Sequence, residues 1–302
     1  MSIYVNTPLL RKEENRIEGK NIWYKMDALQ PTGSFKVRGM ENAAKKAFER
    51  GCKRLLSSSG GNAGMAVAYV GRALGLPVKV VLPESTPNSV VSALENLDAE
   101  VEINGAEWDD SHGYCLGLCE KDKSVAYLPP FDLPEIWDGH ATIVDELKKQ
   151  CAEQPDLIIC SVGGGGLVNG IVAGCKRNGW DKTDILAVET IGADSLNTAF
   201  DTKELISIPA ITSVAKSLGA RCVSKQTLDY ALSGRIIPFR VTDEQAVNAC
   251  RCFADEMRVL VEPACGASLA VAYENMDILD RYNNIVLEIC GGSKVHLCDF
   301  SG

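Results

Sequence analysis

Three glycine-rich turns, each directly after a run of apolar residues, most constrain the fold of this chain. They are SSSGGNAG at 57–64, SVGGGGL at 161–167 and ICGGSK at 289–294. In open α/β sheets, ligands bind beyond the carboxyl ends of the strands, and glycine there lets backbone amides approach a ligand closely. The sequence therefore predicts strands whose ends can line one ligand site.

Short apolar runs alternate with longer segments of helical periodicity. We expect strands at 53–59, 78–83, 99–105, 156–163, 184–190 and 284–292, and helices at 61–75 and 88–98. The later runs are almost continuously apolar, as in parallel strands that are buried on both faces. The alternation predicts βαβ units and a doubly wound α/β fold. Residues 128–139 carry three prolines and no periodicity, so we expect them to cross between two lobes.

Charge and hydropathy exclude several classes of function. The formal net charge of −9 argues against a general nucleic-acid or anionic-membrane binder. No run of about 18 apolar residues predicts a membrane span. The first residues, MSIYVNTPLLRKEENRIEG, lack the apolar core of a secretory signal, so we expect a cytoplasmic protein.

The twelve cysteines do not predict a disulfide framework, because disulfides are rare in a reducing cytosol. Their spacings also lack the paired ligands of a zinc site, and the three histidines are scattered. Cys115 and Cys119 lie four residues apart, on one face of an expected helix, and we interpret them as buried thiols.

The segment PTGSFKVRGM, residues 31–40, places Lys36 after a turn and at the start of an expected helix. Lysine is usually solvated, and the start of a helix favours anions. A helix start that lowers the pKa of Lys36 would make its neutral, nucleophilic form accessible.

Taken in order, the motifs resemble the serine/threonine dehydratase (ammonia-lyase) family of fold type II pyridoxal-phosphate enzymes. They are PTGSFKVRG, SSSGGNAGMA, PPFDLPEIWDGHATI, SVGGGGLVNG, AVETIGA, ITSVAKSLGA and VEPACGA. The likeness covers nearly the whole chain and is greatest to the short liver-type L-serine dehydratases. It implies a tryptophan synthase β-like fold, with two doubly wound open-sheet domains and the cofactor between them. Residues 1–29 and 133–302 would form the large domain and 30–132 the small one.

The resemblance also assigns residues to pyridoxal phosphate. Lys36 would form the Schiff base with the cofactor and later act as the base on the substrate Cα. Phe35 would pack on the cofactor ring, and Asn62 would bond its phenolic oxygen. Cys290 would lie beside the pyridine nitrogen, where a weakly bonding thiol leaves that nitrogen largely unprotonated. The backbone of the tetraglycine turn would hold the phosphate: Gly163, Gly164, Gly165, Gly166 and Leu167.

The first glycine-rich turn is assigned to the substrate. Ser59, Asn62 and Ala63 would face its carboxylate. Related racemases have a serine at the position of Gly60, and that serine gives a proton to the opposite face of Cα. Glycine has no proton to give, so Gly60 favours one-sided chemistry, with Ser59 next to it as a possible substitute.

The resemblance further implies a site for a monovalent cation, usually potassium. Its expected oxygen ligands are Glu189, Ala193, Leu218 and Ala220. For Glu189 alone, a hydrogen-bonded structural carboxylate is the other interpretation. The family also implies a homodimer, which the sequence itself does not show.

The sequence thus predicts a dehydratase that converts L-serine to pyruvate or L-threonine to 2-oxobutanoate, with release of ammonia. Three alternatives stay open. They are a dehydratase or β-replacement enzyme for another β-substituted amino acid, a serine racemase-like enzyme, and a cofactor-binding relative without activity.

Overall fold

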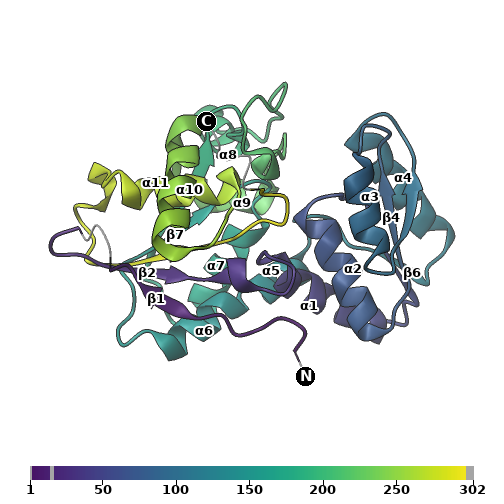
Figure 1. The fold of residues 1–302 in the computed structure, drawn as a ribbon, viewed down its shortest axis with the longest axis horizontal. Coiled ribbons are helices and arrows are strands. Elements are labelled where there is room, and N and C mark those ends of the chain that lie inside the picture. The colour runs from purple at the N-terminus through teal and green to yellow at the C-terminus, as the bar shows by residue number, and fades with distance from the viewer. Residues whose placement is uncertain (1, 14–16, 297–302) are drawn as a thin grey trace.

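The computed structural model describes residues 2–13 and 17–296, whose strands form two separate sheets (Figure 1). All neighbours in the larger sheet are parallel except its first pair, which is antiparallel. Its six strands are, in spatial order, β1 (Leu9–Arg11), β2 (Asn21–Lys25), β10 (Asn284–Glu288), β7 (Leu157–Ser161), β8 (Asp184–Thr190) and β9 (Ile237–Val241).

The smaller sheet is parallel throughout. Its four strands are, in spatial order, β5 (Glu100–Ile103), β4 (Val78–Leu82), β3 (Arg54–Ser57) and β6 (Val125–Tyr127). Its helices are α1 (Lys36–Glu49), α2 (Asn62–Leu74), α3 (Asn88–Glu95) and α4 (Trp108–Lys121). In Figure 1 this part of the molecule, in blue, lies to the right of the larger sheet.

The remaining helices accompany the larger sheet. They are α5 (Pro134–His140), α6 (Thr142–Gln150), α7 (Gly166–Arg177), α8 (Ser195–Thr202), α9 (Lys225–Leu232), α10 (Asp243–Met257) and α11 (Pro263–Tyr273). Short 3-10 turns are η1 (Asp27–Leu29), η2 (Lys216–Leu218) and η3 (Asp277–Leu279). Figure 1 shows α10 and α11 above the larger sheet and α6 below it. Each sheet has its own cluster of buried apolar side chains, as the doubly wound class requires.

Helix α5 joins the two parts, because it packs against α1 on one side and α7 on the other. Glycines permit this approach. A Cβ on Gly39 would lie 2.7 Å from Ile136 Cγ2, and one on Gly170 would lie 2.7 Å from the Trp137 carbonyl oxygen. The crossover expected at 128–139 does link the two sheets, but its second half is helical, since Pro134 suits the first turn of a helix.

A buried ion network fixes the start of α1 to the larger part. Arg38 is fully buried, and its Nε lies 2.6 Å from Asp27 Oδ2 and its Nη1 2.6 Å from Glu146 Oε1. Lys25 pairs with the same Glu146 carboxylate. Because Arg38 lies two residues after Lys36, this network fixes the position of the first turn of α1, to which Lys36 belongs.

The predicted strands and helices are confirmed, each within a few residues of the expected bounds. The sequence did not indicate the short strands β1, β2, β6 and β9. All cysteines that the structure describes are free thiols. Cys115 is buried on α4 as expected, but Cys119, one turn nearer the end of that helix, is only partly buried. In the described part of the chain, no helix is long and apolar enough to cross a membrane. The same residues contain no cluster of three or more His, Cys, Asp or Glu suited to a metal ion.

Candidate active site

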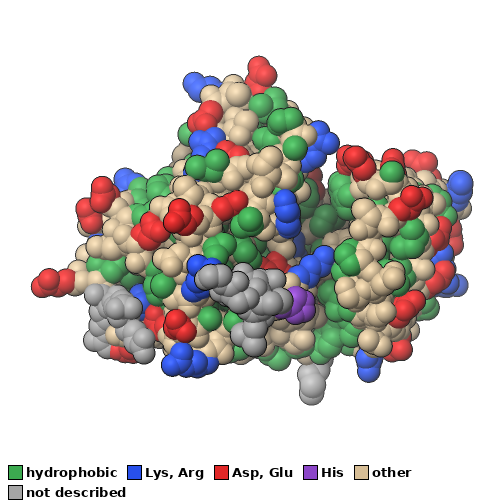
Figure 2. All heavy atoms as spheres, turned by 45° about the horizontal axis from the view of Figure 1, so that its top comes forward, with side chains coloured by type: hydrophobic (Ala, Val, Ile, Leu, Met, Phe, Trp, Pro, Cys, Tyr) green, Lys and Arg blue, Asp and Glu red, His purple; other side chains and the backbone are tan. Residues whose placement is uncertain are grey.

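Two of the three glycine-rich turns, 57–64 and 289–294, meet between the smaller and the larger part. The third packs against Phe131, and the preceding residue, Pro130, contacts Lys36. The amide of Phe35 donates to the Cys290 carbonyl (3.3 Å), which joins the Lys36 turn to the end of β10. The amide of Ser293 donates to Asn62 Oδ1 (2.8 Å), which joins the first turn to the same loop. Figure 2 shows the surface hollowed between the two parts, with charged side chains at its mouth.

Lys36 is the first residue of α1 and is partly buried. Its Nζ donates to the Pro130 carbonyl at 2.6 Å and lies 5.1 Å from the centre of the Phe35 ring. Burial lowers the pKa of Lys36 to about 8, while the nearby Cys290 acts in the opposite direction. The sequence predicted the direction of this shift, but the cause is burial and not the start of the helix.

Phe35 packs between the lysine and a buried histidine. Its ring meets the ring of His140 edge to face, with centroids 4.8 Å apart. Burial lowers the pKa of His140 well below its usual value, so this ring is neutral. Both of its nitrogens are buried and lack a hydrogen-bond partner among the described residues. A neutral His140 adds no positive charge beside Lys36.

Cys290 lies just beyond the end of β10 and is 7% exposed. A hydrogen bond with Cys265, together with burial, raises the pKa of the Cys290 thiol well above its usual value. The thiol is therefore neutral, as the sequence predicted, and is a weak hydrogen-bond donor and acceptor close to Lys36.

The tetraglycine turn runs into the N-terminus of α7. Gly165 has a left-handed φ of 96°, and a Cβ there would overlap the Thr227 hydroxyl. A Cβ on Gly164 would overlap the ring of Phe131, and one on Gly163 would lie 3.2 Å from Leu218 Cα. The amides of Gly164, Gly165 and Gly166 find no acceptor among the described residues. Free amides at the start of a helix fit a phosphate group, and Leu167 follows them in the first turn.

The first turn precedes α2. Ser59 Oγ accepts from the Gly61 amide (3.2 Å), and Ala63 is buried in the first turn of the helix. Asn62 Nδ2 lies 3.3 Å from each carboxylate oxygen of Glu262. A Cβ on Gly60 would lie 3.1 Å from Val90 Cγ1, so this position faces an apolar wall.

The residues expected to hold a cation are only partly brought together. The Glu189 carboxylate accepts bonds from the Leu196 amide (2.9 Å), the Asn197 amide (2.8 Å) and Asn197 Nδ2 (2.8 Å). Burial raises the pKa of Glu189 to about 8. Leu218 borders the tetraglycine turn, and Ala220 lies two residues after it in the sequence. Ala193 is buried and precedes α8. Glu189 thus caps the start of α8, which is the structural interpretation left open above.

Several residues around the site were not predicted from the sequence: Pro130, Phe131, His140, Ser217, Thr227, Glu262 and Ser293. All of them except Thr227 lie inside the quoted motifs and turns, so membership of those segments was the available signal. Thr227 comes close only through folding.

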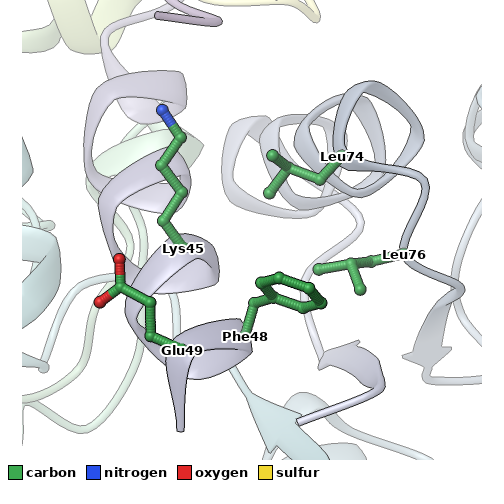
Figure 3. A pocket seen from close by; sticks show the side chains of 5 residues that line it. All are labelled: Lys45, Phe48, Glu49, Leu74 and Leu76. Carbon is green, nitrogen blue, oxygen red and sulfur yellow. The ribbon is translucent and has the colours of Figure 1, made fainter. Parts of the chain in front are cut away.

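A separate surface cavity of about 120 Å³ lies between the ends of α1 and α2, away from Lys36 (Figure 3). Its walls are Lys45, Phe48, Glu49, Leu74 and Leu76, with the three apolar side chains turned toward one another. It contains none of the predicted site residues.

The fold and site together define an α/β enzyme with a lysine of lowered pKa and a turn suited to a phosphate, which Pro130 and Phe131 connect. A family model described as pyridoxal-phosphate dependent enzyme matches residues 2–291, and the chain belongs to this family. Its cofactor is therefore pyridoxal phosphate, and the free amides of the tetraglycine turn and the placement of Lys36 fit that group.

Individual relatives narrow the comparison. A mouse (Mus musculus) protein named L-serine dehydratase/L-threonine deaminase is 39% identical over 98% of this chain and 93% of its own length. A rat (Rattus norvegicus) protein named serine dehydratase-like is 42% identical, over 96% of this chain and 90% of its own length. The crystal structure of a fungal L-serine ammonia-lyase from Rhizomucor miehei superposes with a TM-score of 0.91 at 32% identity. It covers 100% of this chain and 98% of that one.

Proposed function

We propose that this protein is an L-serine/L-threonine dehydratase (ammonia-lyase). It removes water from the β-hydroxy amino acid and yields pyruvate or 2-oxobutanoate together with ammonia. The observation that carries the proposal is Lys36, whose nitrogen has a pKa of about 8 and donates to the carbonyl of Pro130, the residue before the Phe131 that packs on the tetraglycine turn. Relatives named for this activity match nearly the whole chain.

When bound, pyridoxal phosphate supplies the electron sink that makes the Cα proton of an amino acid removable. Lys36 is the group that moves this proton, since a neutral amine with a pKa near 8 is an effective base close to neutral pH. Its present partner, the Pro130 carbonyl, only accepts hydrogen bonds. The contact therefore uses an N–H of Lys36 and leaves the lone pair of the neutral amine available to a substrate.

The residues around Lys36 are proposed to bind and orient the cofactor and the substrate. We assign the phosphate to the amides of Gly163–Gly166 and Leu167, and the cofactor ring to the space beside Phe35 and Cys290. Asn62 donates to the phenolic oxygen. A neutral Cys290 would not hold a proton on the ring nitrogen, which would favour elimination over transamination. The substrate carboxylate is assigned to Ser59, Asn62 and Ala63 at the start of α2.

Gly60 separates elimination from racemisation in this proposal. It has no proton to deliver, and a Cβ there would crowd Val90 (3.1 Å) and Leu82 (3.2 Å). Chemistry is therefore confined to the face of Cα served by Lys36. We expect the wild-type enzyme to form no D-serine, and Gly60→Ser to form some as Val90 and Leu82 shift; chiral chromatography of the product measures both.

The finer assignments belong to the same proposal. We propose residues 1–29 with 133–302 as the large domain, 30–132 as the small domain, a cytoplasmic homodimer, and potassium held by oxygens of Glu189, Ala193, Leu218 and Ala220. Potassium would have to displace the hydrogen bonds that Glu189 now accepts. If it binds, keto-acid formation rises when potassium replaces a bulky organic cation at constant ionic strength.

The test of the proposed function is a keto-acid assay with L-serine and with L-threonine on cofactor-loaded protein. The expected result is stoichiometric keto acid and ammonia. Cofactor binding without keto acid would contradict the dehydratase. Adding a thiol nucleophile then tests β-replacement, because that activity gives a thioether amino acid in place of ammonia.

A further inference from the structure

Glu262 precedes α11 at its N-cap position, but its side chain does not cap that helix. An acid at an N-cap ordinarily accepts bonds from the first amides of its own helix. Here both carboxylate oxygens turn the other way. Oε1 accepts from the Lys294 amide (3.0 Å), and Oε2 accepts from Ser217 Oγ. Both oxygens also lie 3.3 Å from Asn62 Nδ2.

The hydrogen-bonding capacity of Asn62 is almost fully used. Its Oδ1 accepts from the Ser293 amide (2.8 Å) and from Ser293 Oγ (2.7 Å), which occupies both lone pairs. One hydrogen of Nδ2 points to the Glu262 carboxylate. The single remaining polar group of this side chain is the second N–H of Nδ2. Asn62 can therefore only donate to a ligand.

The opposite orientation of the amide is excluded by the same contacts. Turning Asn62 over would set its Oδ1 against the Glu262 carboxylate and its NH₂ against the Ser293 amide. One acceptor–acceptor contact and one donor–donor contact would replace two hydrogen bonds, and only the Ser293 hydroxyl, which can donate or accept, would keep its bond.

The absence of a side chain at Gly292 leaves room for the Glu262 carboxylate. Glu262 is 5% exposed, and a Cβ on Gly292, whose φ is 145°, would overlap its side chain. Asn62 belongs to α2 of the smaller part, whereas Glu262 and Ser293 belong to the larger part. The contact therefore also spans the two parts at the site.

We infer that Glu262 is a positioning residue that locks the Asn62 amide as a hydrogen-bond donor toward the cofactor. The inference rests on the proposed role of Asn62 and adds the group that fixes its polarity. Glu262 acts through Asn62, so its removal matters only while Asn62 is present.

The test is a double-mutant cycle on the full-length protein with Glu262→Ala, Asn62→Ala and the double variant. Pyridoxal phosphate is titrated into each, and both the dissociation constant and the absorbance maximum of the bound cofactor are measured. We expect each single variant to bind roughly tenfold more weakly and to shift the absorbance maximum. The double variant should match Asn62→Ala in both readouts.

Glu262→Gln serves as the conservative variant, since it keeps the volume and one acceptor oxygen. It should retain part of the wild-type affinity and absorbance, and it carries the test if Glu262→Ala does not fold. Glu107→Gln is the matched control, because Glu107 is an exposed acid that does cap its own helix, α4. It should leave both readouts unchanged.

Additive effects of Glu262→Ala and Asn62→Ala would overturn the inference, and so would an unchanged absorbance maximum in Glu262→Ala. These outcomes are distinct from failure of the proposed function. Wild-type protein that binds pyridoxal phosphate but gives no keto acid contradicts the dehydratase alone. Wild-type protein that binds no pyridoxal phosphate contradicts both.

Discussion

The tetraglycine turn and the Asn62 turn both border the site, yet different forces hold them. The tetraglycine turn is fixed by sterics, since side chains on Gly164 and Gly165 would overlap Phe131 and Thr227. The Asn62 turn is fixed by hydrogen bonds to groups distant in sequence, including Glu262. Gly61 in that turn has room, with its nearest neighbour for a Cβ 3.7 Å away.

This difference indicates which substitutions each of the two turns tolerates. A close-packed backbone turn resists added volume but contains no polar side chain to lose. The Asn62 turn accepts added volume at Gly61 but not at Gly64, where a Cβ would overlap the Ser59 carbonyl oxygen, and it is weakened when one hydrogen-bond partner is removed. The phosphate is thus assigned to the tetraglycine turn, which is held by packing, and the substrate carboxylate to the Asn62 turn, which is positioned by hydrogen bonds.

Lys36→Ala should give the largest effect, because Lys36 is the proposed base and its amine bonds the Pro130 carbonyl, which belongs to neither turn. We expect keto-acid formation to fall by at least roughly 10²–10⁴-fold. Thermal unfolding should stay within a few degrees of wild type. A folded variant that retains most of its activity would show that another group moves the proton.

Gly165→Ala and Gly61→Ala form a matched pair across the comparison. Gly165 combines a left-handed φ of 96° with an overlap at Thr227, so its substitution should cost about 2–4 kcal/mol in unfolding free energy. Gly61 has a φ of −98° and free space, so its substitution should cost within about 1 kcal/mol. Urea unfolding of both variants measures the difference, and equal costs would contradict the distinction.

The pH dependence of cofactor capture tests the environment of Lys36. Its folded pKa of about 8 lies below the value of 10.5 for an unperturbed lysine, so the neutral amine is present above about pH 8. The capture rate, followed by stopped-flow absorbance, should fall about tenfold per pH unit below this value. The unfolded chain binds more protons between about pH 8 and 10.5, so this group raises stability as pH increases through that window. A capture rate that keeps rising to pH 10 would contradict the lowered pKa.

Tyr127→Phe should give the smallest effect, and of the two turns it should act on the Asn62 turn. The Tyr127 hydroxyl lies 2.7 Å from Ser58 Oγ, and Ser58 directly precedes Ser59 of the substrate turn. The hydroxyl also lies 2.7 Å from His112 Nδ1, and losing both hydrogen bonds should raise KM for L-serine roughly fivefold while kcat stays near wild type. Tyr114→Phe is the control, because its hydroxyl bonds Glu102 at the outer strand of the same sheet. A matching KM change in both variants would contradict the assignment.

Local signals made much of this molecule predictable from its sequence. Alternating apolar runs predicted the strands, and glycine after a strand predicted the turns that now border the site. The start of α1 at Lys36 was predicted because the turn and the helical pattern adjoin in sequence. In each case the determining residues lie within a few positions of one another.

Features set by distant contacts were not predictable. Asn62 and Glu262 are 200 residues apart, and no local pattern signals that they share a hydrogen bond. The pKa of Lys36 depends on burial, which only the packed structure defines. Glu189 ends an apolar strand, but whether it binds an ion or caps a helix depends on the position of α8.

The most direct test of the central claim is one absorbance and product measurement on protein loaded with pyridoxal phosphate. Wild type should show the band of lysine-bound cofactor and convert L-serine to pyruvate. Lys36→Ala should lose both. A protein that shows neither, or a Lys36→Ala variant that keeps both, would contradict the account.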